Sequence, residues 1–197
     1  VRPRVRRRPG VLAGRVALAS ASLIRPREAR AAKGLTVVLE SEVTILDPHA
    51  TTAAITRTFG THVFDTLFAM NDKGEIKPQM VESYDSSPDK LTWTFVLRDG
   101  LKWHDGNAVT AEDCVASLKR WSVRDPLGKM LMADTASLEA TNPKTIKFVL
   151  KQPFPLLLEV LGKPNAPLPV MMPARLAATP ADQRIPEPIG SGPFRFL

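Results

Sequence analysis

The sequence predicts an α/β protein, because residues 91–121 combine the patterns of a strand, tight turns and a capped helix within one stretch. At its start, large apolar residues alternate with other residues, the period-two pattern of a half-buried strand: Trp93, Phe95 and Leu97. At its end, five residues fall on one face of a helix: Ala111, Cys114, Val115, Leu118 and Trp121. A second alternating segment at 136–150 adds a hairpin. Together these elements predict an α/β fold with mixed sheets.

The other elements follow from capping and turn signals along the chain. Thr110, three residues before Asp113, has the pattern of a helix N-cap with an acidic N3 residue. Asn142-Pro143 is a turn signal that closes the predicted hairpin. We further expect a strand at 35–39, a turn at Asp47-Pro48, a helix at 52–68, a hairpin turn at 71–74, and short helices at 154–161 and 174–178.

The net charge of +7 is concentrated at the N-terminus. Residues 1–33 carry ten Lys or Arg and one acidic residue, whereas residues 34–197 carry seventeen basic and nineteen acidic residues. Since nucleic-acid binding requires clustered positive charge on the folded surface, we expect no nucleic-acid partner. Residues 1–33 are typical of a signal-peptide-like leader, with a basic start, a mostly apolar stretch and a small-x-small segment at 29–31. The alternatives are a disordered basic tail or an incorrectly chosen start site.

Candidate reactive groups are few. Cys114 is the only cysteine, which excludes an intramolecular disulfide, and its apolar helix face predicts a buried thiol. The three histidines, His49, His62 and His104, are separated by 13 and 42 residues, which matches no metal-site spacing. Ser191 lies between two glycines without the spacing of a nucleophile elbow or the lysine of a P-loop. We therefore expect no metal, no cofactor and no catalytic activity, and a structural bend at the glycines.

Five segments, in the same order, resemble a known family. They read LDPH at 46–49, VFDTL at 63–67, IKPQMVESY at 76–84, the 91–121 stretch, and PIGSGPF at 188–194. Together they resemble the family 5 extracellular solute-binding proteins, the peptide-, nickel- or glutathione-binding receptors of bacterial ABC importers.

This resemblance implies a fold like that of type II periplasmic binding proteins, here as an incomplete first lobe that carries a small inserted α+β subdomain. Residues 34–47 would begin the main lobe, 48–188 would hold the inserted subdomain and its connections, and 189–197 would be a returning strand of the main lobe. The second lobe would be missing, so the resemblance implies a fragment of a longer receptor.

The resemblance also implies a function. The chain would belong to a monomeric periplasmic receptor that captures short peptides or a similar small solute and works with an ABC importer permease in the inner membrane. The implied ligand contacts are the loop residues Thr51, Thr52 and Ala53, followed by Glu40 and Ser41. For the two threonines, capping of the following helix is the alternative role. A truncated relic that binds nothing, or a one-lobe interaction module, remains the alternative function. An enzyme would require a role for Ser191 or Cys114.

Overall fold

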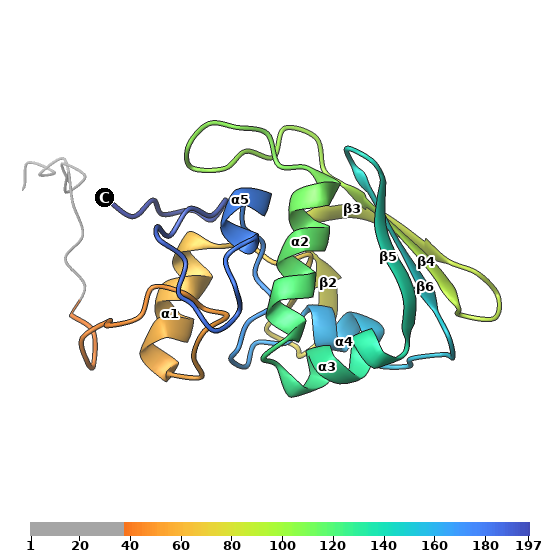
Figure 1. The fold of residues 1–197 in the computed structure, drawn as a ribbon, viewed down its shortest axis with the longest axis horizontal. Helices are drawn as coiled ribbons and strands as arrows, with labels where there is room; N and C mark the ends of the chain where they lie inside the picture. The colour runs from red at the N-terminus through yellow and green to blue at the C-terminus, as the bar shows by residue number, and fades with distance from the viewer. Residues whose placement is uncertain (1–37) are drawn as a thin grey trace, which may run out of the picture. The chain divides into compact units, whose positions relative to one another are not determined.

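The computed structural model describes residues 38–197 (Figure 1). The predicted leader at 1–33 and most of the predicted strand at 35–39 lie outside these residues. Residues 39–53 contain no strand and no helix. Leu39, which we expected to be the last residue of a strand, is therefore not part of one. The turn predicted at Asp47-Pro48 is present, and the amide of Ala50 closes it by donating to the carbonyl of Asp47 at 3.1 Å.

The centre of the fold is a four-stranded sheet with the strand order β3-β4-β6-β5. Its strands are β3 (Val81–Ser86), β4 (Thr92–Leu97), β5 (Thr135–Asn142) and β6 (Thr145–Leu150). Every neighbouring pair is antiparallel, so the mixed sheets that we predicted are not found among the described residues. For two of these pairs the reason is local: β3–β4 and β5–β6 are joined by short turns, and short turns permit only antiparallel pairing. The predicted hairpin at 136–150 is confirmed as β5 and β6.

A separate two-stranded hairpin precedes this sheet. β1 (Phe68–Met70) and β2 (Ile76–Pro78) pair around the turn predicted at 71–74, which is confirmed. The helix before them, α1 (Ala54–Val63), is shorter than the predicted 52–68. The chain leaves the helix at Phe64 because Thr66 pairs with Val170 and the carbonyl of Asp65 accepts from Met171. Leu67 is buried, but it lies beyond the helix.

Helices cover one face of the four-stranded sheet. α2 (Ala111–Ser122) and α3 (Pro126–Ala133) pack against it, and the short helices α4 (Leu157–Leu161) and α5 (Ala174–Ala177) lie beside them (Figure 1). The predicted apolar face of α2 is buried in the core together with the inward side chains of β4 and β6. Phe95 and Phe148 meet edge to face across these strands, with their ring centroids 5.8 Å apart. Burial raises the pKa of the Cys114 thiol far above its usual value, as expected of an inert core cysteine.

The start of α2 connects several parts of the fold through one carboxylate. Thr110 and Asp113 form the predicted capping box: the amide of Thr110 donates to Asp113 Oδ2 at 2.9 Å, and the amide of Asp113 donates to Thr110 Oγ1 at 3.3 Å. Asp113 also accepts from Trp103 Nε1 at 3.2 Å and from the amide of Ala174 at 2.7 Å. The carboxylate therefore holds the preceding loop and the start of α5 as well as its own helix.

Replacing Asp113 with Ala is expected to lower the free energy of unfolding by about 2–3 kcal/mol, because a helix cap is lost and other donors lose their acceptor. Urea denaturation followed by circular dichroism measures this loss. The neighbouring Glu112→Ala is the control, since Glu112 is exposed and should change stability by no more than about 0.5 kcal/mol. Equal midpoints for the two variants would contradict the connecting role of Asp113.

Candidate functional site

The loop before α1 is held by a buried ion pair. Asp47 Oδ2 lies 2.7 Å from Arg120 Nη2, and Asp47 Oδ1 lies 3.1 Å from Arg120 Nη1, with the two side chains only 1% and 2% exposed. The carboxylate also accepts from the amide of His49 at 3.0 Å and from that of Ile185 at 3.1 Å. Burial alone would raise the pKa of Asp47, but the hydrogen bonds and the charge of Arg120 outweigh it, so the pKa is below its usual value. Asp47 is therefore a fully paired carboxylate.

Arg120 extends this connection to a third part of the chain. It projects from α2, and it donates from Nε to the carbonyl of Thr179 at 2.9 Å and from Nη2 to that of Gln183 at 2.8 Å. The guanidinium thus binds the loop before α1 through Asp47, and it binds residues 179–183 through their backbone carbonyls. A planar guanidinium with several donors suits this arrangement, which a lysine could not reproduce.

His49 completes the group, which we call the Asp47 network (Asp47, His49 and Arg120). Its Nε2 donates to the carbonyl of Val170 at 3.0 Å, whereas its buried Nδ1 has no hydrogen-bond partner among the described residues. Burial lowers the pKa of His49 to about 4, although the nearby charge of Asp47 acts in the opposite direction. His49 is therefore neutral near pH 7, and it anchors the loop to the 168–171 segment.

The predicted ligand residues directly follow this network. Thr51 is half-buried, and Thr52 and Ala53 are exposed. Neither threonine caps α1, whose N-cap is Ala53 and which has no side-chain cap; Thr51 Oγ1 instead accepts from the amide of Ala53 at 3.1 Å. Glu40 and Ser41 lie in an exposed bend, and no hydrogen bond among the described residues joins them to this loop. The three loop residues are consecutive in the chain, whereas no hydrogen bond among the described residues connects Glu40 or Ser41 to them.

The C-terminal segment lies along the C-terminal end of α1. The amides of Gly192 and Phe194 donate to the carbonyls of Val63 and His62, each at 3.0 Å. Residues 190–197 form no strand, so the returning strand predicted at 189–197 is not found there; the backbone binds the end of a helix instead of a neighbouring strand. A Cβ atom at Gly190 would lie 2.0 Å from the carbonyl oxygen of Val63. The close approach of two backbones, in addition to any bend, therefore requires glycine here.

Ser191 has a structural partner. Its hydroxyl donates to Asp65 Oδ2 at 2.7 Å, and Asp65 Oδ1 accepts from Gln79 Nε2 at 2.8 Å. No histidine takes part in this chain of contacts, so a general base of the serine-hydrolase type is absent from it. The arrangement fastens the C-terminal segment to the loop after α1.

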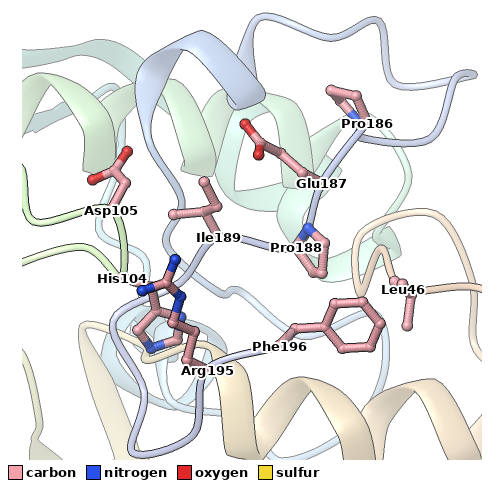
Figure 2. A pocket seen from close by; sticks show the side chains of 9 residues that line it. All are labelled: Leu46, His104, Asp105, Pro186, Glu187, Pro188, Ile189, Arg195 and Phe196. Carbon is pink, nitrogen blue, oxygen red and sulfur yellow. The ribbon is translucent and has the colours of Figure 1, made fainter.

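A pocket of about 350 Å³ lies beside the loop before α1 (Figure 2). Its lining comprises Leu46, His104, Asp105, Pro186, Glu187, Pro188, Ile189, Arg195 and Phe196. Arg175 forms ion pairs with both Asp105 and Glu187, so these carboxylates are already neutralised. The pocket can admit a small polar solute, but Thr51, Thr52 and Ala53 do not line it. Sequence reasoning missed it because its walls come from segments that are far apart in the chain.

Within residues 38–197, no group of three His, Cys, Asp or Glu side chains is placed to hold a metal ion. In the same part of the chain, none of the helices combines the length and the apolar character that a membrane span requires. His49 and His104, which we considered as metal ligands, instead bind the backbone carbonyls of Val170 and Gly192.

The fold is that of the type II periplasmic binding proteins. A solved structure of AgaA from A. tumefaciens R10, in complex with agropinic acid, superposes with a TM-score of 0.66 at 34% identity, covering 79% of this chain and 31% of that one. Residues 75–197 match the family described as bacterial extracellular solute-binding proteins, family 5 Middle, and the chain belongs to this family.

Curated relatives agree with this assignment. A probable peptide ABC transporter periplasmic-binding protein of Sinorhizobium fredii is 40% identical over 186 residues, which is 94% of this chain and 34% of the relative. The glutathione-binding protein GsiB of Escherichia coli K12 is 32% identical over 187 residues, or 93% of this chain and 36% of the relative. The chain therefore spans about a third of the length of the curated relatives it matches.

Replacing Arg120 with Ala is expected to lower the free energy of unfolding by about 3–5 kcal/mol, because it leaves the buried carboxylate of Asp47 without its counter-ion. Chemical denaturation measures the change. Arg124→Ala is the matched control from the same part of the chain: Arg124 is exposed, and its one long contact, 3.3 Å to the carbonyl of Ala181, should be worth less than about 1 kcal/mol. A loss below about 1 kcal/mol for Arg120→Ala would contradict the buried pair.

Replacing Gly190 with Ala is expected to detach the C-terminal segment from α1, because the added methyl group overlaps the carbonyl of Val63. The measurement is hydrogen exchange at the amides of Gly192 and Phe194, which should lose protection. Gly100→Ala is the control, because Gly100 has a positive φ of 76° but open space around it. That variant should lower overall stability by about 1 kcal/mol without affecting these two amides. Unchanged protection in Gly190→Ala would show that the close approach is wrong.

Proposed function

We propose that this chain is part of the substrate-binding component of a bacterial ABC importer, which captures short peptides or a similar small solute in the periplasm. The observation that carries the proposal is family membership together with 40% identity, over 94% of the chain, to a probable peptide ABC transporter periplasmic-binding protein. The partners would be the solute and an importer permease in the inner membrane, and the receptor would act as a monomer.

The proposed ligand contacts are Thr51, Thr52 and Ala53, with Glu40 and Ser41 as further candidates. The geometry of the loop supports the first three. α1 begins without a side-chain cap, and the first amides of a helix need acceptors. A carbonyl or carboxylate oxygen of a peptide is such an acceptor, and the positive end of the helix dipole favours it. The exposed hydroxyl of Thr52 adds a group that can both donate and accept.

The proposal includes a division of the chain and excludes catalysis. Residues 34–47 would begin the main lobe, 48–188 would form the inserted subdomain with its connections, and 189–197 would return to the main lobe. The surroundings of the two candidate nucleophiles support binding without catalysis. Cys114 is buried with a raised pKa, and the Ser191 hydroxyl donates a hydrogen bond to Asp65 Oδ2.

Titration calorimetry with glutathione and with tri-alanine tests the function. The sample is the polypeptide recovered from a periplasmic extract, whose intact mass shows how much sequence accompanies these 197 residues. The double variant Thr51→Ala, Thr52→Ala should bind about tenfold more weakly, since each lost hydrogen bond is worth about 0.5–1.5 kcal/mol.

Thr61→Ala is the matched control, because Thr61 is an exposed threonine of α1 whose hydroxyl donates only to the carbonyl of Thr58. Its affinity should equal that of the unmodified protein. Equal affinity in the double variant would remove the two threonines from the site. Failure of both probes to bind, together with failure of a mixture of periplasmic peptides, would overturn peptide capture.

A further inference from the structure

We propose that the Asp47 network positions the loop 47–53 and releases it on acidification, so that solute binding depends on pH. The part of this inference that concerns solute binding rests on the proposed function, because it takes Thr51, Thr52 and Ala53 as ligand contacts. Asp47, His49 and Arg120 would act as positioning residues that do not touch the solute themselves.

The contacts show how the loop is held from behind. Asp47 binds Arg120 of α2 and the amide of Ile185, and His49 binds the carbonyl of Val170. Pro48, between them, packs so closely on α1 that a Cβ atom at Gly60 would lie 2.9 Å from its Cγ. The three consecutive residues thus each contact a different part of the fold. The chain then reaches the exposed side chain of Thr52 within three further residues of His49.

His49 is the group that acid can switch. Its Nε2 must carry a proton, because its partner is a carbonyl, so the neutral ring leaves a lone pair on Nδ1. That atom is buried without a partner among the described residues. A second proton would therefore create a buried, unpaired N–H and a positive charge close to Arg120. Opening of the loop exposes the ring to water, which can then accept from the N–H and solvate the positive charge.

Burial, rather than the surrounding charges, determines the direction of the pH effect, because the nearer charge of Asp47 acts against it. The charges acting on His49 are Asp47 on its own loop and Arg120 on α2, and the 168–171 segment contributes the carbonyl of Val170. Burial lowers the pKa of His49 from 6.5 to about 4 in the closed loop. The open form therefore binds the proton more tightly, and the stability of the closed loop is lost as the pH falls from about 6.5 towards 4. The pKa of Asp47 is lowered from 3.8, so Asp47 adds to the effect only in stronger acid.

The primary test is hydrogen exchange at pH 7 and pH 5, read at the amides of His49, Ala50 and Ile185 and corrected for intrinsic exchange. Protection of these amides should fall by up to about twenty-fold, the change in the ratio of closed to open loop that follows from the pKa difference. Amides of β4 and β6 should keep their protection. A merely structural contact would lose loop and sheet protection together.

Two histidine variants make the test specific. His49→Gln keeps an N–H that can reach the carbonyl of Val170 but cannot titrate, so its loop protection should be the same at both pH values. His62→Gln is the control, since His62 is an exposed histidine of α1, and it should behave like the unmodified protein. If His49→Gln does not fold, Arg120→Lys replaces it. Lysine keeps the charge but loses the two-point contact, and loop protection should already be reduced at pH 7.

Affinity for glutathione and tri-alanine, measured at the same two pH values, tests the link to solute binding. Affinity that falls in acid for the unmodified protein but not for His49→Gln supports the proposal. If affinity is the same at both pH values although the loop opens in acid, the link between loop release and solute binding is overturned. Loop protection that ignores pH, or a His49→Gln profile equal to that of the unmodified protein, overturns the release itself. If neither probe binds at either pH, the proposed function fails, and the exchange data still decide whether the loop is released.

Discussion

The buried pair of Asp47 and Arg120 is the interaction on which the arrangement of the described chain most depends. Its partners are 73 positions apart, and the amide of Ile185 reaches the same carboxylate from 138 positions away. Removing two charges from water is so unfavourable that a buried pair persists only where every donor and acceptor has a partner. Here the carboxylate accepts four hydrogen bonds and the guanidinium also binds two carbonyls. The pair therefore holds together three parts of the chain: the loop before α1, α2 and residues 179–185.

Features that depend on neighbouring residues could be predicted from the sequence. Thr110 and Asp113 are three positions apart, and their capping box formed as expected. The alternation in β4 and the hairpin of β5 and β6 could be predicted equally well, because strand periodicity and turn residues are local properties. The pattern also showed which face of α2 would be buried, since that face must cover apolar sheet residues whatever the wider fold.

Features that depend on distant partners could not be predicted in this way. Arg120 stands beside Lys119 in the sequence, and nothing local distinguishes the exposed lysine from the buried arginine. The helical spacing of Ile55, Phe59 and Val63 continues to Leu67, yet α1 ends at Val63 because Thr66 pairs with Val170. The glycine at position 190 suggested a bend, whereas its close approach to Val63 depends on a segment that lies far away in the chain.

The loop 47–53 is held by hydrogen bonds on one side and exposes side chains on the other, and this asymmetry has a thermodynamic consequence for any solute that binds it. Ordering a mobile loop during binding reduces affinity, whereas a loop ordered in advance avoids that loss. The Asp47 network orders the backbone through groups that a solute need not contact, so the exposed side chains of Thr52 and its neighbours are free to differ without loss of that order. The same separation explains why a neutral, buried histidine matters here. In the proposed release, a proton on His49 would change none of the proposed ligand contacts, but it would remove the order on which those contacts depend.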